Sequence, residues 1–130
     1  MTTEEPLARG ETILVVEDDK DLRRFVVTVL SRLGYEVLEA GSGKRALAVL
    51  KNSPEVDLVL SDVLLPGGRS GPDIAEEAQR HRPNLKFLFM SGYVTAESHH
   101  QGWLRDGADL LSKPFTKRDL AQKVRAVLDS

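Results

Sequence analysis

Cysteine is absent from this 130-residue chain. Its absence excludes disulfide bonds, a thiolate nucleophile, thiol redox chemistry and zinc sites built on cysteine. No apolar run approaches the ~18 residues needed to cross a bilayer, and the polar, acidic first residues do not predict a secretion signal. We therefore expect a cytoplasmic protein that does not bind a membrane.

A large excess of charge of either sign is also lacking. The chain has 18 Lys and Arg against 20 Asp and Glu, a formal net charge of −2. Nucleic-acid binding normally requires a basic excess, so we expect no direct contact with nucleic acid. The apolar residues, 41% of the chain, can supply one core, and 130 residues fit one domain better than a two-domain enzyme.

Hydrophobic periodicity predicts alternating strands and helices over residues 12–130, after a flexible lead-in over residues 1–11. Buried strands are predicted at five short apolar runs, residues 12–17, 35–40, 57–62, 86–91 and 108–112. A helix is predicted after each strand, with the fourth at about residues 95–105. Asp19 and Gly34 fit the two ends of the first helix, and Pro72 fits the first turn of the third.

This alternation with short connections indicates βαβ units with right-handed crossovers. The predicted fold class is therefore α/β, with a doubly wound, five-stranded parallel sheet in a (βα)5 arrangement. In such sheets, functional residues gather beyond the carboxyl ends of the strands, where loops meet the starts of helices. The residues that end each strand are thus the candidates for a functional site.

Acidic, hydroxyl and basic side chains stand at these strand ends. Glu17 and Asp18 follow the first strand, Asp62 ends the third, Ser91 ends the fourth, and Lys113 follows the fifth. Any one of them could be a helix cap or a solvated charge. Together they predict a site, because an acid that closes a buried strand has its charge partly desolvated unless a cation pairs with it.

The chemistry of this set points to magnesium and phosphate. Clustered carboxylates repel one another, by roughly 4 kcal/mol at about 4 Å and a surface-like dielectric, and a divalent cation removes that cost. Oxygen ligands without His or Cys suit Mg2+. A carboxylate nucleophile beside Mg2+, a lysine and a hydroxyl is typical of phosphoryl transfer. Asp62 would be the acceptor, and Lys113 and Ser91 would bind the phosphoryl oxygens.

Four short motifs now carry a resemblance to a known family. In chain order they are ILVVEDD, LVLSDVLLPGG, FMSG and KPF. In this order, each at a strand end, they resemble the response regulator receiver domain family, which includes chemotaxis-type regulators and the receiver modules of hybrid histidine kinases. The resemblance covers about Glu11 to Leu128. It implies a flavodoxin-like receiver fold with strand order 2-1-3-4-5.

The resemblance also implies roles for individual residues. Asp62 would be the phosphoacceptor, and Mg2+ would be bound by Asp18, Asp62 and the backbone carbonyl of Leu64, with Glu17 nearby through water. A cis peptide bond is implied between Lys113 and the proline that follows it.

The implied function is a two-component phosphorelay. The domain would take a phosphoryl group from a histidine kinase or a histidine phosphotransfer protein, assist its own phosphorylation and dephosphorylation, and turn over no metabolite. It would then shift between two conformations on the face formed by residues 95–105, the fifth strand and the last helix, a face that is also a candidate for homodimer contacts. Because the last predicted helix reaches the end of the sequence, we expect output through a downstream protein or an attached domain, including that of a hybrid kinase.

Several positions depart from the commonest family pattern. Leu110 stands where many members carry Tyr or Phe as a rotamer switch, and Tyr93 lies two residues after the hydroxyl residue. Leu64 and Tyr93 flank the predicted phosphoryl position, where polar side chains would orient an attacking water. The hypothesis is a comparatively long-lived phosphoaspartate.

Two alternative functions differ from this one. A pseudo-receiver that binds partners without phosphorylation remains open because of Leu110. A phosphatase of the haloacid-dehalogenase type is disfavoured, because such enzymes need a second Asp two residues after the nucleophile, and here Leu64 follows Asp62 at that spacing. The pair Arg23 and Arg24 is interpreted as a solvated helix face beside the site, where a kinase would approach.

Overall fold

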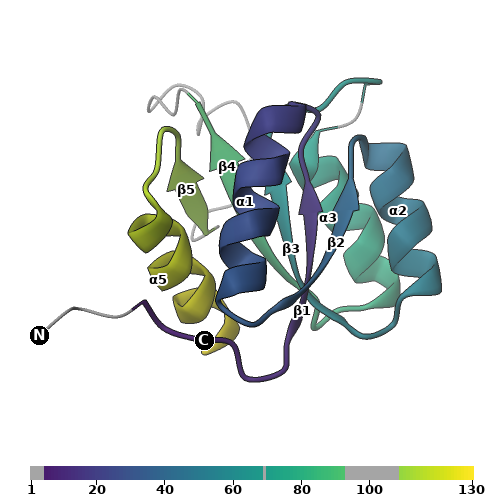
Figure 1. Cartoon of the computed structure of the whole chain (residues 1–130). Helices are drawn as coiled ribbons and strands as arrows, with labels where there is room; N and C mark the ends of the chain where they lie inside the picture. The colour runs from purple at the N-terminus through teal and green to yellow at the C-terminus, as the bar shows by residue number, and fades with distance from the viewer. Residues whose placement is uncertain (1–4, 69, 93–108) are drawn as a thin grey trace, which may run out of the picture.

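Within residues 5–68, 70–92 and 109–130, which the computed structural model describes, five parallel strands form one sheet (Figure 1). The strands are β1 (Thr12–Val16), β2 (Glu36–Ala40), β3 (Val56–Asp62), β4 (Lys86–Ser91) and β5 (Leu110–Ser112). Their order across the sheet is β2-β1-β3-β4-β5. The predicted strand order and the doubly wound α/β class are both confirmed.

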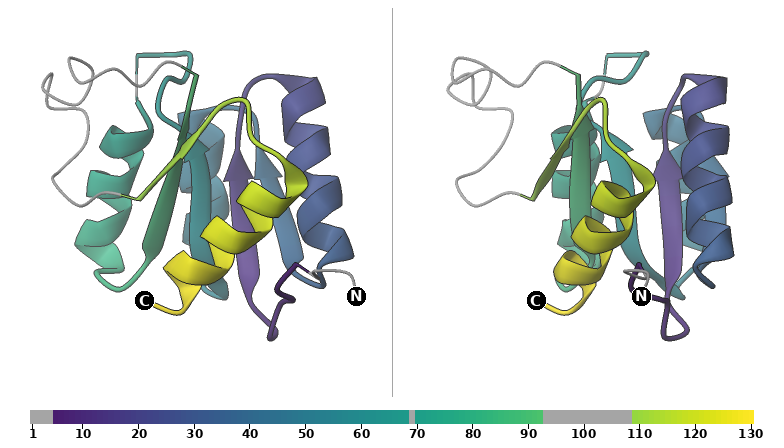
Figure 2. Two further views of the ribbon diagram at one scale, coloured as in Figure 1. Left: turned by 90° about the vertical axis from the view of Figure 1, so that its left-hand side faces the viewer. Right: turned by 60° about the vertical axis from the view of Figure 1, so that its left-hand side comes forward.

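Helices cover both faces of this sheet. They are α1 (Lys20–Arg32), α2 (Gly43–Asn52), α3 (Gly71–His81) and α5 (Lys117–Leu128). Helices α1 and α5 lie on one face, and α2 and α3 lie on the other, as the two views of Figure 2 also show. The helix predicted at about residues 95–105 lies outside the described residues. Among the described helices, none has the length and apolar character of a membrane span.

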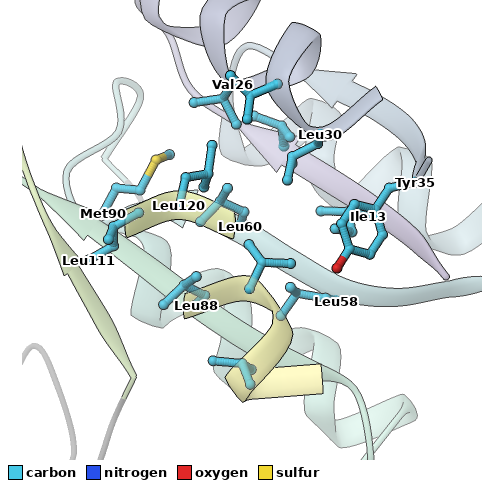
Figure 3. Packing of buried hydrophobic residues seen from close by; sticks show 14 residues of the cluster. Ile13, Val26, Leu30, Tyr35, Leu58, Leu60, Leu88, Met90, Leu111 and Leu120 are labelled. Carbon is cyan, nitrogen blue, oxygen red and sulfur yellow. The ribbon is translucent and has the colours of Figure 1, made fainter. Parts of the chain in front are cut away.

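The strands are buried on both faces, as their continuous apolar runs predict. Successive side chains of β1 alternate between the two cores: Ile13 and Val15 face α1 and α5, and Leu14 and Val16 face α2 and α3. Figure 3 shows the first core, to which several elements contribute fully buried side chains, among them Ile13, Val26, Leu30, Leu58, Leu60, Leu88, Met90 and Leu120. The resulting rigid sheet fixes the strand ends.

Capping side chains start each helix directly after a short loop. Asp19 caps α1 as predicted, and its carboxylate accepts hydrogen bonds from the next two free backbone N–H groups at 2.9 and 3.1 Å. Ser42 caps α2, and Ser70 and Thr116 form capping boxes at α3 and α5. Gly34, predicted beyond the end of α1, has a φ of +101° that favours glycine. These caps keep the strand-to-helix loops short at the carboxyl edge.

Part of the predicted lead-in contacts the domain. Arg125 of α5 donates hydrogen bonds to the backbone carbonyl of Leu7 at 3.2 Å and to the carboxylate of Glu11 at 2.6 Å. Residues 1–4 lie outside the described residues. Flexibility of the lead-in therefore stays a prediction, but its second half packs against the last helix because Arg125 supplies donors to it.

Candidate functional site

Three carboxylates meet at the carboxyl edge of the sheet. Strands β1 and β3 are neighbours, with Val16 paired to Ser61, so the residues that follow them leave the sheet at the same height. Glu17, Asp18 and Asp62 each offer a carboxylate oxygen, and these oxygens lie within 4.8 Å of one another. Glu17 is buried, Asp18 is exposed and Asp62 is half-buried. The structure thus brings together the acids that the strand ends suggested.

Lys113 joins this cluster from the far side of β4. Its Nζ lies 2.9 Å from Oε1 of Glu17 and 3.0 Å from Oδ2 of Asp62. Its backbone N–H donates to the carbonyl of Ser91 at 2.8 Å, and its peptide bond to Pro114 is cis, as the resemblance predicts. The lysine is therefore held by both its backbone and its ammonium group, and it bridges two of the three acids.

Burial and hydrogen bonding set the charge states of this bridge. Burial raises the pKa of the Glu17 carboxyl, although hydrogen bonds from the Asp19 backbone N–H, at 3.0 Å, and from Lys113 oppose the shift. Burial alone would lower the pKa of Lys113, but its hydrogen bonds to Glu17 and Asp62 outweigh that effect and raise it. The lysine is thus cationic at neutral pH, as an ion pair with Asp62 requires.

The other candidate residues line the same edge. Ser91 is the last residue of β4, is half-buried and pairs with Ser112 of β5. Leu64 follows β3 by two residues and is 61% exposed. Leu110 is half-buried and packs against the core under α2 and α3. Tyr93 lies outside the described residues. The roles of Ser91 and of the Leu64 carbonyl stay predictions.

Arg23 contacts the site, which corrects the interpretation of the Arg23 and Arg24 pair as solvated. Its Nη1 donates to the backbone carbonyl of Glu17 at 2.7 Å, and its Nε donates to Glu39 at 3.2 Å. Only 20% of its side chain is exposed, whereas Arg24 is exposed. A sequence signal existed: helical side chains lean toward the helix N-terminus, so an arginine in the first turn of α1 can reach back to the end of β1.

Comparison with known proteins decides the family. The model of the family described as "Response regulator receiver domain" matches residues 13–125. The chain belongs to the response regulator receiver domain family. Its relatives include the response regulator receiver protein CpdR of Brucella abortus, which is 34% identical over 116 residues, 89% of this chain and 95% of CpdR.

Two further similarities are to a transcriptional regulatory protein and to the receiver domain of a hybrid histidine kinase. The chain is 39% identical over 116 residues, 89% of its length, to an uncharacterized transcriptional regulatory protein, YrkP of Bacillus subtilis, and it spans only 48% of that relative. The solved receiver domain from the hybrid histidine kinase CckA superposes with a TM-score of 0.75 at 34% identity, covering 90% of this chain and 98% of that one. Receiver domains similar to this one thus occur both alone and within longer chains.

The backbone around Asp62 in this receiver domain is packed against the start of α3. Ser61 Oγ donates to the Asp62 carbonyl at 2.9 Å, and the Gly71 N–H donates to the Val63 carbonyl at 2.8 Å. A Cβ on Gly71 would collide with the Asp62 carbonyl oxygen and would lie 3.1 Å from Ser61 Oγ. The roles of Gly71 and Ser61 could not be predicted from the sequence, because such a close approach has no local pattern.

The donor set fits a hard divalent cation. It consists of carboxylate oxygens without nitrogen or sulfur ligands, which suits Mg2+. Both oxygens of Glu17 already accept hydrogen bonds, from Lys113 and from the Asp19 N–H. The carboxylate of Asp18 is exposed and makes no hydrogen bond to another described residue. These contacts are compatible with Asp18 and Asp62 as direct ligands and Glu17 as an indirect one, and that assignment stays a prediction.

Proposed function

We propose that this receiver domain accepts a phosphoryl group on Asp62 as part of a two-component phosphorelay. One observation carries the proposal: Lys113 Nζ lies 3.0 Å from Asp62 and 2.9 Å from Glu17, inside a cluster of acids that can hold a cation. A nucleophile with a paired lysine and a cation site has the parts that phosphoryl transfer needs. Family membership supports the same assignment.

The transfer step uses the carboxylate of Asp62 as the nucleophile. Its oxygen forms a bond to the phosphorus of a phosphohistidine on a histidine kinase or a phosphotransfer protein, and the P–N bond breaks. The electron pair remains on the imidazole nitrogen, which takes up a proton from solvent. Lys113 then donates to a phosphoryl oxygen in place of the Asp62 oxygen, and the Ser91 hydroxyl donates to another.

Magnesium would be held by Asp18, Asp62 and the backbone carbonyl of Leu64, with Glu17 contacting it through water. The bound ion supplies neutralisation of the charge on the phosphoryl oxygens. Two features of the chain itself support the transfer. Lys113 balances the charge of the acids before transfer, and the contacts of Ser61 and Gly71 with the Asp62 backbone keep Asp62 in place.

Phosphorylation of Asp62 would change the conformation of the domain and would not convert a metabolite. New charge-assisted hydrogen bonds from Lys113 and Ser91 to the phosphoryl group would bias the domain between two conformations, and a few kcal/mol of differential interaction is enough. The partners would be a histidine kinase or phosphotransfer protein and an output protein or attached domain. A homodimer through the face that includes β5 and α5 and a cytoplasmic location complete the proposal.

Phosphorylation by a small donor tests this function. Wild type and Asp62→Asn are incubated with acetyl phosphate and MgCl2, and intact mass is measured. Wild type should gain the mass of one phosphoryl group and the variant should gain none. A wild type that stays unmodified, or a variant modified as fully as wild type, would remove Asp62 as the acceptor and favour a phosphorylation-independent interaction module.

A further inference from the structure

The backbone carbonyl of Glu17 lies where the hydrogen-bond ladder between β1 and β2 ends, so β2 offers it no N–H donor. The Glu17 N–H still donates to the Ala40 carbonyl at 3.1 Å, but β2 ends at Ala40 and Ser42 already caps α2. A buried backbone carbonyl needs a donor. Arg23 provides it, with Nη1 at 2.7 Å from the Glu17 oxygen. A charged group on α1 thus completes the end of the ladder.

Arg23 is itself held from two sides. Glu39 of β2 accepts a hydrogen bond from Nε at 3.2 Å. The guanidinium also lies against Gly41, where an added Cβ would come within 3.0 Å of Nη1. Charge-assisted hydrogen bonds to a carbonyl and a carboxylate are stronger than neutral ones. The arginine therefore ties α1, β1 and β2 together at one peptide unit.

That peptide unit joins Glu17 to Asp18. Its plane sets the direction in which Asp18 leaves the backbone, and the Asp18 carboxylate makes no hydrogen bond to another described residue that would orient it. We propose that Arg23 is a positioning residue for Asp18 and that it raises the affinity of the acidic cluster for Mg2+. The inference rests on the proposed function, because it assigns Asp18 to that ion.

The direction in which removal of Arg23 changes Mg2+ affinity distinguishes a positioning role from a purely electrostatic one. Arg23 is a cation close to an acidic cluster, so Coulomb's law alone predicts that its removal strengthens Mg2+ binding. Positioning predicts the opposite, because residues that orient metal ligands typically change affinity by about tenfold or more when they are mutated. Arg24 is a matched control: it is adjacent on α1, has the same charge and is exposed.

The test is an MgCl2 titration of the full chain, followed by NMR through the amide shifts of Asp18 and Asp62. We expect Arg23→Ala to bind Mg2+ about tenfold more weakly than wild type, and Arg24→Ala to bind as wild type does or slightly more tightly. Gly41→Ala keeps every charge but crowds the guanidinium, so it should also weaken binding. This variant serves the test even if Arg23→Ala folds poorly.

Two results would overturn the inference. The first leaves the proposed function intact, and the second contradicts both. If wild type binds Mg2+ at these amides and both Arg23→Ala and Gly41→Ala bind it at least as tightly as Arg24→Ala, Arg23 does not position Asp18 and the proposed function stands. If wild type shows no Mg2+-dependent shift at Asp18 or Asp62, the metal site fails, and the proposed function fails with it.

Discussion

Lys113 Nζ lies 3.0 Å from Oδ2 of Asp62, across 51 positions of sequence. The side chains are 22% and 14% exposed, so the pair is only partly screened by water. Removing one partner of such a pair leaves an uncompensated charge in a poorly solvated place. The ammonium group of Lys113 therefore supplies positive charge to the acidic cluster. Without it, a bound cation would have to supply that charge.

Replacement of Lys113 by methionine should tighten Mg2+ binding. The variant leaves Glu17 and Asp62 without their shared counter-charge, and loss of a nearby cation favours a divalent ion by about tenfold or less after screening. The measurement is an MgCl2 titration monitored by NMR. Lys117→Met, the same substitution at an exposed position of α5, is the control and should bind as wild type does. Equal affinities in the two variants would contradict the bridging role.

Gly71→Ala should destabilise the domain. The new methyl group collides with the Asp62 carbonyl oxygen, so β3 and α3 must move apart, at a typical cost of about 1–3 kcal/mol. Urea unfolding measures the change. Gly92→Ala is the matched control, since within residues 5–68, 70–92 and 109–130 no atom beyond its chain neighbours lies within 4 Å of its added Cβ. Unfolding of both variants at the same urea concentration would show that β3 and α3 tolerate a methyl group at position 71.

Stability should fall in acid through the contact between Glu11 and Arg125. The hydrogen bond from Arg125 lowers the pKa of Glu11 from 4.5 to about 2, with a smaller contribution from the Arg9 backbone N–H, and Asp129 and the Tyr35 hydroxyl also contact the guanidinium. Because the folded-state pKa is the lower one, the stabilisation is present above pH 4.5 and is lost as the pH falls toward 2.

Glu11→Gln isolates this contribution. A shift of that size would equal about 3 kcal/mol if fully expressed, and solvent screening at a partly exposed pair reduces it to about 1–2 kcal/mol. Urea unfolding of both proteins from pH 6 to pH 3 should therefore show wild type more stable at pH 6 and the difference shrinking toward pH 3. A difference that stays constant over this range would show that Glu11 does not titrate with folding.

Leu64→Asn should shorten the lifetime of the phosphorylated state. Leu64 is 61% exposed beside the site, and its side chain cannot orient an attacking water. One added hydrogen bond in the transition state, of about 1 kcal/mol, would speed hydrolysis by about fivefold. The phosphate loss of both proteins is timed after removal of the donor. Equal rates would sink the hypothesis of a long-lived phosphoaspartate.

Much of the fold and part of the site could be predicted from local patterns. Strands buried on both faces give continuous apolar runs, and the carboxyl ends of parallel strands share one edge. That is why Asp18, Asp62 and Lys113 could be grouped from the sequence alone. Asp19 could be assigned as a cap because capping depends on neighbours in sequence.

Contacts between distant elements could not be predicted in this way. Arg23 reaches Glu39 only because α1 lies beside the end of β2, and Glu11 meets Arg125 across 114 positions. Gly71 matters because of one carbonyl that approaches it from β3. Each depends on packing distances between elements, which periodicity does not specify. The contacts of Arg23 and Gly71 support the residues at the strand ends, whereas Glu11 and Arg125 join the start of β1 to the last turn of α5.

Intact mass shows directly whether Asp62 accepts a phosphoryl group in the presence of magnesium. Wild type, Asp62→Asn and Asp57→Asn, a control at the opposite end of β3, are treated with acetyl phosphate in MgCl2 or in excess chelator. We expect one added phosphoryl group on wild type and on Asp57→Asn, only when magnesium is present, and none on Asp62→Asn. Modification of Asp62→Asn to the level of wild type, or no modification of wild type in magnesium, would contradict it.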